Sequence, residues 1–374
     1  SLNTGQFYEG DGEQITMTGN MGFALGDKGF FSLSGEYSDT KSTSRSVQYC
    51  TGNACLDPNN DNYLGGGRFD NTLSGYSDET YVAGLSTANL GGESVVQPWG
   101  QPNNSAVRLF FNSGYEISDS MKFYAFGNYS ESEGDGSFYY RYPGNGTIEN
   151  LRTEDGGLYS PLEKFPGGFT PRFFGDITDM SILSGLEGEF SNGMTYDFSG
   201  RFGSNEIQYT LKNTINPSMG PDSPTSFRPG DLINEELQFS ADFVQILDMG
   251  MENEVLFAFG LTYMEESYEL VGNDVDSYAA GPYSLGDPWG FCDNDIATAA
   301  GLAVIANGST LDCADSSDAV YTAVGVGSNG FPGYSPEYSG KYERDMAGIY
   351  IDVSTDVSDA LFVQGALRYE DYSD

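Results

Sequence analysis

The sequence predicts an all-β protein, an antiparallel transmembrane β-barrel, and three observations carry the prediction. Short turns alternate with long, polar, Gly-rich segments along the chain. On both sides of each short turn, roughly ten residues alternate between apolar and polar side chains, as β-strands do. Charged residues stand in mid-strand among the polar positions, which a wet lumen tolerates and a dry sandwich core does not. The five short turns are 26–29, 118–120, 191–193, 248–250 and 357–359.

The composition agrees with this class. The chain has 374 residues with 50 Gly, 26 Tyr and 25 Phe, which suits strands and turns better than helices. Its net charge of −39 argues against a nucleic-acid partner, because phosphate binding needs clustered Lys and Arg. The chain contains no run of about 18 apolar residues, so no transmembrane helix is predicted. No signal peptide is visible from Ser1 onward, so we expect a piece of a longer chain whose leader lies upstream.

The first three strands are expected at residues 2–8, 13–25 and 31–38. In the second of them Met17 and Phe23 fall on one face and Thr18 falls on the other, the period of two that a half-buried strand shows. The turn at 26–29 joins the second strand to the third.

Eight more strands follow. Those at 107–117, 180–190 and 194–202 alternate cleanly, as do those at 237–243, 347–354 and 361–370, whereas 123–126 and 256–259 are apolar on both faces. Eleven strands leave an open sheet with two unpaired edges, which lipid does not tolerate. We therefore expect a partial barrel, about 10–11 of about 22 strands. The alternative is a strand overlooked inside loop 41–104 or loop 269–343.

The long loops are expected on one side of the membrane. Every short turn falls on the opposite side, so a chain that enters from the periplasm places the long loops outside the cell. These extracellular loops are about 41–104, 136–178, 209–235 and 269–343.

Charged side chains on the polar face of the strands are the candidate lumen-lining residues, against the simpler interpretation of a solvated interior. They are Glu36, Arg108, Glu187, Glu189, Asp197, Arg201, Asp242, Asp352, Arg368 and Glu370. Tyrosines near strand ends on the other face are candidates for the aromatic girdle that anchors a barrel at the membrane interface. They are Tyr37, Tyr129, Tyr196, Tyr263 and Tyr369.

Loop aromatics are candidates for stacking on a substrate, or for ordinary packing among folded loops. The candidates are Trp99, Tyr139, Tyr140, Tyr142 and Trp289. Residues 293–307 predict a short helix within the longest loop, capped by Asp293 or Asn294 and ended by Gly308.

The four cysteines form two local pairs, Cys50 with Cys55 and Cys292 with Cys313. Both pairs fall in long loops, which fits disulfides in an oxidising compartment. A zinc site with four cysteine ligands is the alternative, although the spacing lacks the usual C-x2-C knuckles.

The sequence contains no complete catalytic or cofactor-binding motif. The chain has no His, which removes His-dependent triads and H-E-x-x-H zinc sites. Residues 325–330 match G-x-G-x-x-G, but Phe331-Pro332 follows where a dinucleotide site needs a helix. Residues 57–62 resemble the start of a calcium loop, yet Arg68 stands where a bidentate Glu belongs. A loop-bound Ca²⁺ of irregular geometry stays open, and no other cofactor or metal is expected.

Several segments resemble the barrel of TonB-dependent receptors. The segment Ala366 to Asp374, which reads ALRYEDYSD, resembles a strand that recurs in mid-barrel in that family. Residues 6–12 and 22–30 resemble the first barrel strands after the plug, and Glu36-Tyr37-Ser38-Asp39 resembles the next strand end. The resemblance covers the whole chain loosely and these segments closely.

The resemblance implies part of a Gram-negative outer-membrane receptor and transporter, not an enzyme. Its implied partners are outer-membrane lipid, its own plug domain and the TonB complex, with the plug expected before Ser1 and more strands after Asp374. It would bind a scarce nutrient with the outer loops and pass it through the lumen. The substrate could be a siderophore, oligosaccharide, peptide or cofactor. The alternatives are a passive porin and a secreted all-β binding or adhesion module.

Overall fold

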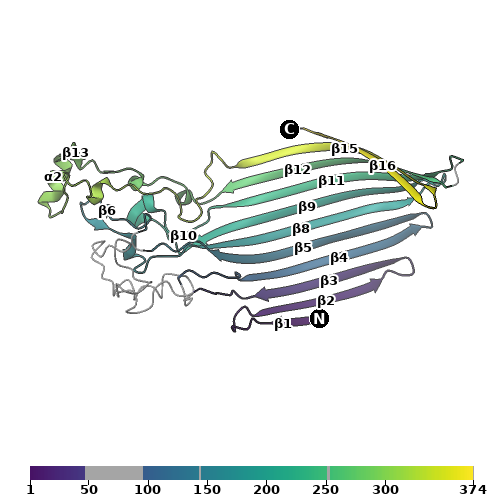
Figure 1. Ribbon diagram of the computed structural model, residues 1–374, viewed down its shortest axis with the longest axis horizontal. Coiled ribbons are helices and arrows are strands. Elements are labelled where there is room, and N and C mark those ends of the chain that lie inside the picture. Colours follow the sequence, from purple (N-terminus) through teal and green to yellow (C-terminus); the bar gives the residue numbers. More distant parts are fainter. Residues whose placement is uncertain (47–95, 143–144, 251–252, 374) are drawn as a thin grey trace.

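One antiparallel sheet dominates the computed structural model, which describes residues 1–46, 96–142, 145–250 and 253–373 (Figure 1). The sheet has 12 strands in the order β1-β2-β3-β4-β5-β8-β9-β11-β12-β15-β16, and the short β10 pairs with β9 off this path. Neighbours in the sheet are therefore neighbours along the chain, and β1 and β16 are its open edges. The prediction of an all-β, open antiparallel sheet is confirmed. None of the described helices is long and apolar enough to span a bilayer.

The strands of the main sheet are β1 (Leu2–Gly5), β2 (Gln14–Ala24), β3 (Gly29–Thr40), β4 (Asn104–Ser118), β5 (Met121–Ser137), β8 (Arg172–Glu189), β9 (Thr195–Lys212), β10 (Ser226–Phe227), β11 (Gly230–Leu247), β12 (Val255–Gly272), β15 (Gly340–Ser358) and β16 (Leu361–Tyr372). Two small hairpins lie in the connections, β6 (Leu151–Arg152) with β7 (Leu158–Tyr159) and β13 (Cys292–Asp293) with β14 (Ile296–Ala297). The helices are η4 (Pro161–Glu163), η5 (Pro217–Asp222), η6 (Val275–Ser277), η7 (Pro282–Ser284), α2 (Ala299–Ala306) and η8 (Ala319–Tyr321).

The eleven predicted strands are all present, but their bounds differ from the expected ones. Strands β8, β9, β11 and β12 each have 18 residues and continue well into the predicted loops. The extra residues mix apolar and polar side chains on both faces, as Phe173 and Phe174 of β8 and Leu232 and Ile233 of β11 show, so the hydrophobic alternation stops before the strand does. Strand β1, in contrast, ends at Gly5 because the chain turns through Gly10 and Gly12, both at positive φ.

The tight turns gather at one end of the sheet and the long connections at the other (Figure 1). The long connections with described structure are 138–171, 213–229 and 273–339, all shorter than predicted because the strands are longer. Most of the connection between β3 and β4 lies outside the described residues, and so do Cys50, Cys55 and the calcium-like segment 57–62.

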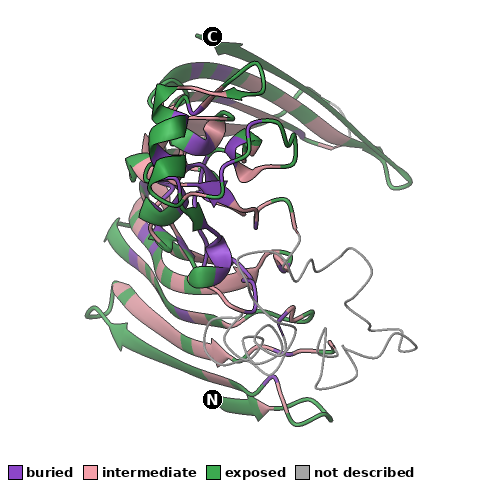
Figure 2. Ribbon diagram, turned by 90° about the vertical axis from the view of Figure 1, so that its left-hand side faces the viewer, coloured by how far each residue is buried: buried purple, intermediate pink, exposed green. Residues whose placement is uncertain are grey.

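The long connections pack together into one body, which we call the cap: the described residues of 138–171, 213–229 and 273–339. Figure 2 shows buried residues concentrated there. One hydrophobic cluster joins Phe169 to Ile215, and another joins Leu151 to Tyr283, so each combines two connections. The hydrophobic core of the described chain therefore sits largely in the cap, while the apolar side chains of the sheet stay exposed.

The helix in the longest connection differs from its prediction. Residues 292–297 form the β13–β14 hairpin, so α2 starts only after Thr298, whose side chain accepts a hydrogen bond from Gly301 N. Asp293 and Asn294 do not cap it, because Asn294 and Asp295 take positive φ in the hairpin turn. A disulfide joins Cys292 to Cys313, with Cα atoms 5.5 Å apart, and spans the helix. The glycine-rich segment 325–330 is a loop, as predicted.

Candidate functional site

The sheet register divides the strands into two faces of opposite character. One row of directly paired residues crosses eight strands from β4 to β16, and most of its side chains are charged or polar. We call the face that carries this row the polar face. The row is Glu116, Lys122, Glu187, Asp197, Asp242, Gly260, Tyr350 and Arg368.

Next to each of these residues along its strand is one that points to the other side, which we call the apolar face. The corresponding row is Tyr115, Phe123, Leu186, Phe198, Ala241, Leu261, Ile349 and Tyr369. Most of its members are well exposed: Leu261 and Ile349 each show 54% of their surface. An apolar row this long, open to the surroundings, is abnormal for a water-facing surface.

The structure places all ten predicted lumen-lining residues on the polar face, since each keeps the alternation of this row. Several of them form ion pairs with a neighbour on the same face. Arg108 pairs with Glu36 at 2.6 Å, Arg368 pairs with Glu370 at 2.6 Å, and Glu187 pairs with Lys122 at 2.7 Å.

The centre of the polar face holds a pair of carboxylates. Asp197 of β9 and Asp242 of β11 are direct partners in the register, an arrangement of like charges that destabilises a sheet. Each accepts a hydrogen bond from a tyrosine two strands away. Tyr124 Oη lies 2.7 Å from Asp197 Oδ1, and Tyr350 Oη lies 2.7 Å from Asp242 Oδ1.

Glycines on the intervening strands make these two hydrogen bonds possible. Tyr124 crosses Gly185 of β8, where a Cβ atom would stand 2.5 Å from the tyrosine Cζ. Tyr350 crosses Gly260 of β12 in the same way, and a Cβ there would meet both the ring and the Asp242 carboxylate. The arrangement repeats about the β9–β11 pair, with a tyrosine, a glycine and an aspartate on each side.

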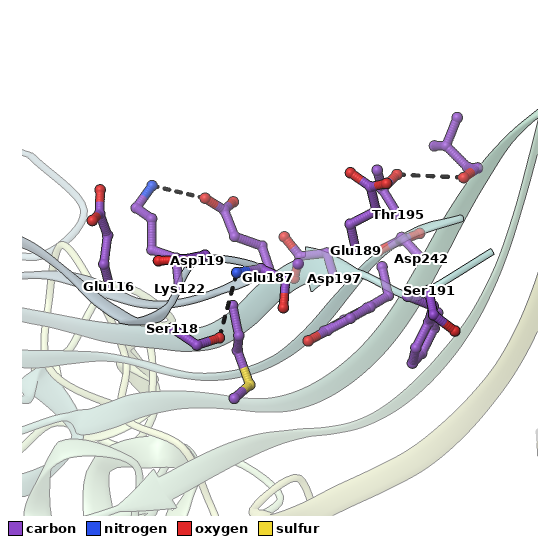
Figure 3. Close-up of a pocket in the computed structure, with 16 residues that line it drawn as sticks. Glu116, Ser118, Asp119, Lys122, Glu187, Glu189, Ser191, Thr195, Asp197 and Asp242 are labelled. Carbon is purple, nitrogen blue, oxygen red and sulfur yellow. Dashed lines mark hydrogen bonds and ion pairs between the residues drawn. The ribbon is translucent and has the colours of Figure 1, made fainter. Parts of the chain in front are cut away.

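An open recess of about 1070 Å³ lies on the polar face toward the tight turns (Figure 3). Its charged lining is Glu116, Asp119, Lys122, Glu187, Glu189, Asp197 and Asp242. Lys122 is the one cation in this lining and is paired with Glu187. Within the described chain, no ion pair neutralises Glu116, Glu189, Asp197 or Asp242, so the recess is strongly acidic.

Sequence reasoning missed several polar-face residues. Lys122 lies two residues after the tight turn at 118–120 and just before the segment 123–126, which the sequence predicts to be apolar on both faces. Glu236 pairs with Arg201 but lies in a part of β11 just outside the expected strand. Extending the alternation past the apolar residues would have found both. Strand periodicity gives no sign that Tyr124 and Tyr350 extend across glycines to hydrogen-bond aspartates.

The tyrosine candidates for the girdle all lie on the apolar face by alternation. Tyr129 donates its hydroxyl hydrogen to Glu131, and Tyr263 donates to Glu265 with the two oxygens 2.8 Å apart. Both acceptors lie toward the long connections. These two tyrosines therefore mark a boundary, with apolar residues on one side and outward carboxylates on the other.

The five loop aromatics divide into two groups. Trp99 and Tyr139 are 56% and 70% exposed and touch edge to face, with ring centroids 5.5 Å apart. Tyr140 is buried and bonds Gly167 O, with Tyr142 beside it. Trp289 packs on Tyr283 and donates to Arg152 O at 3.0 Å. Tyr140 and Trp289 thus belong to the packing of the cap, the second of the two interpretations that the sequence leaves open for these aromatics.

Burial and neighbouring charge raise the pKa values of two groups in the cap. Burial, together with the nearby Glu163 carboxylate, raises the pKa of Tyr159, and burial raises the pKa of Glu149. Among the described residues, no three His, Cys, Asp or Glu side chains come together as metal ligands would.

The chain resembles known proteins in its fold and not in its sequence. No protein-family model matches the chain, and no curated protein matches its sequence. Solved structures do. The siderophore receptor PirA from Acinetobacter baumannii is 12% identical, with a TM-score of 0.47, over 100% of this chain and 38% of its own. The ferric enterobactin receptor from Pseudomonas aeruginosa is 9% identical, with a TM-score of 0.46, over 99% of this chain and 38% of its own.

The outer membrane transporter YddB from Escherichia coli is 8% identical, with a TM-score of 0.49, over 96% of this chain and 34% of its own. The chain thus spans little more than a third of the receptors that it matches. It matches them over essentially its whole length, as an open antiparallel sheet and partial barrel.

Proposed function

We propose that the chain is part of the barrel of a TonB-dependent outer-membrane receptor, which binds a scarce nutrient with its extracellular loops and passes it through the lumen. The observation that carries the proposal is the division of one sheet into two faces. The exposed apolar row from Tyr115 to Tyr369 suits lipid, and the charged row one residue away suits a wet interior.

The hydroxyl groups of two tyrosines support an orientation with the long connections outside the cell. Tyr129 and Tyr263 aim their hydroxyls at carboxylates on the side of the long connections, as interfacial tyrosines do where the hydrocarbon ends. The cap then lies outside the cell and the tight turns lie in the periplasm. A folded cap with its own core provides a rigid platform for substrate, as loops on a barrel rim require.

The polar face is the expected contact for the plug domain. The carboxylates of Asp197 and Asp242, which no ion pair neutralises within the described chain, need cations or water, and a plug surface bearing Arg or Lys would supply the charge. We propose the TonB complex as the energy-coupling partner of the full-length receptor. We assign no catalytic role to these carboxylates, and place the protein in the Gram-negative outer membrane.

The test uses the full-length protein, purified from outer membranes and reconstituted into liposomes. A plugged receptor is expected to need detergent for solubility and to give no swelling of liposomes in a sugar solution. Swelling at the rate of a general porin would replace the proposal with passive diffusion. A protein that stays monomeric without detergent would replace it with a secreted binding module.

A further inference from the structure

Helix α2 is exposed to solvent although it has no polar side chain. Its residues, Ala299–Ala306, read AAGLAVIA, and only Gly301 and Val304 are buried. The other six are exposed, and Leu302 and Ile305 show 59% and 38% of their surface. A helix that is apolar on all sides is normally buried on all sides. The open side of α2 is therefore abnormal for a surface that faces only water.

The buried side of α2 fixes the helix on the cap. A Cβ atom on Gly301 would stand 2.2 Å from Phe291 O, so the glycine lets the helix approach this closely. Val304 belongs to one buried cluster with Phe291 and Val320. Gly156 of the 138–171 connection lies against the same valine, since a Cβ atom there would stand 2.6 Å from Val304 Cβ. The open side is thus presented in a fixed position.

Leu302 and Ile305 are neighbours on the open side. Residues three or four apart along a helix lie next to each other on its surface, so the two side chains form a ridge. Ala299 lies three residues before Leu302 and Ala306 lies four residues after it, and both lengthen the ridge. An apolar patch that is open to solvent and fixed in place is typical of a protein–protein interaction site.

The charges near this ridge are all negative. Residues 273–339, which contain α2, include nine Asp or Glu and no Lys or Arg. Asp293 and Asp312 each adjoin a cysteine of the disulfide that spans α2. Asp155 directly precedes Gly156, which lies against the helix. Within the described chain, none of these three aspartates forms an ion pair.

The one arginine of the adjoining β6–β7 hairpin does not offset these acids. Arg152 is paired with Asp318, with Nη2 2.7 Å from Oδ2, and the two side chains are only 3% and 6% exposed. The surface around α2 therefore combines an apolar ridge with carboxylates that are open to a partner.

We propose that α2 is the docking surface for a cationic polypeptide with an apolar face, of the basic amphipathic helix type. The apolar face covers Leu302 and Ile305, and this contact supplies most of the affinity. Lys or Arg residues beside that face meet the carboxylates around α2, which orients the partner and speeds its association.

Charge favours this occupant over two others. A second copy of the chain would bring the same carboxylates against each other, and like charges across an interface are unfavourable. The phosphates of a lipid surface are also negative, and Figure 1 shows α2 at the end of the cap that points away from the sheet. The inference goes beyond the proposed transport function and rests on it only for the location of α2 outside the cell.

The test uses the full-length protein in nonionic detergent micelles and a dye-labelled helical peptide of about 18 residues, with leucines on one face and lysines on the other. Fluorescence anisotropy measures binding, and empty micelles give the blank. A scrambled peptide keeps the composition and loses the apolar face, whereas a peptide with glutamate for lysine keeps the face and reverses the charge. We expect saturable binding of the leucine–lysine peptide and at least about tenfold weaker binding of each control peptide.

Two variants test whether the peptide binds at α2. Leu302→Gln and Ile305→Gln each place an amide in the ridge, and each is expected to weaken peptide binding about tenfold. Both side chains are exposed, so both variants are expected to fold, which circular dichroism checks. Val275→Gln is the matched control, because Val275 is 58% exposed in η6 of the same connection and lies outside α2. It is expected to bind the peptide as wild type does.

Equal binding to wild type and to both α2 variants, equal loss in Val275→Gln, or no saturable binding to folded wild type would each overturn the proposal. Tight binding of the glutamate peptide would overturn the choice of a cationic partner. A wild type that dimerises where Leu302→Gln stays monomeric would replace the partner with a second copy. The liposome experiment reports on the barrel alone, so failure of docking and failure of the proposed function remain distinguishable.

Discussion

Tyr124 of β5 lies across Gly185 of β8 and places its hydroxyl 2.7 Å from Asp197 Oδ1 and 2.9 Å from Oδ2 on β9. The hydrogen bond therefore spans a whole strand, and it opposes the repulsion between Asp197 and the directly paired Asp242. Tyr350 does the same for Asp242 from the other side. The centre of the polar face is thus fixed by two tyrosines that sequence periodicity does not single out.

Gly185→Ala is expected to destabilise the barrel, because the new Cβ would stand 2.5 Å from the Tyr124 ring. Displacing the tyrosine breaks its bond to Asp197, and overpacking of this kind costs about 1–3 kcal/mol. Urea unfolding of the full-length protein in lipid vesicles measures the loss. Gly22→Ala is the control, since Gly22 lies on the same face and a Cβ added there would meet nothing within 4 Å. Equal stability of the two variants would contradict the account.

Much of the sheet could be predicted because alternation and turn chemistry act locally. The eleven strands, the tight turns and the ten polar-face residues follow from a period of two. The strand ends could not be predicted, because β8 and β11 continue where apolar and polar side chains are mixed on both faces and no longer alternate. The cap could not be predicted either, because contacts such as Phe169 with Ile215 join segments far apart in the sequence.

Asp318→Asn is expected to loosen the cap strongly. Arg152 and Asp318 join two separate connections, their side chains are only 3% and 6% exposed, and Nη2 lies 2.7 Å from Oδ2. Removing one partner leaves a buried charge uncompensated, which costs about 3–5 kcal/mol. Hydrogen–deuterium exchange of cap peptides from 145–171 and 310–325 would report faster exchange.

The matched control is Glu9→Gln, which removes a pair with Arg45 in which the arginine is 42% and the glutamate 58% exposed. A pair of this kind contributes about 0–1 kcal/mol, so cap exchange should barely change. If the two variants exchange alike, the buried pair does not hold the cap together.

Replacing both Cys292 and Cys313 with Ser is expected to destabilise the part of the cap around α2. The disulfide closes a sequence separation of 21 residues, and the chain-entropy estimate for a loop of that size is about 3 kcal/mol. Exchange in peptides from 291–313 should rise, while peptides from β8 and β9 stay protected. Unchanged protection around α2 would show that Phe291, Val304 and Leu311 hold this region without the bond.

Glu149→Gln is expected to stabilise the cap at neutral pH. Burial raises the pKa of Glu149 in the folded protein, so ionisation favours the unfolded cap. The cost is absent below the unfolded pKa of about 4.3 and develops as the pH rises through the folded value. Slower exchange of the variant at neutral pH, converging with wild type in acid, is the predicted result. A difference that grows in acid would have the opposite sign and refute it.

The most direct test of the central claim compares two adjacent positions on β12. Leu261 lies on the apolar face, 54% exposed, and Thr262 lies on the polar face. Spin labels at Leu261→Cys and Thr262→Cys of the full-length protein in lipid would be exposed to oxygen and to a water-soluble nickel chelate. The account predicts that oxygen relaxes the label at position 261 while the chelate does not, and that position 262 shows the reverse preference. Equal access of the chelate to both labels would contradict a lipid-facing apolar face.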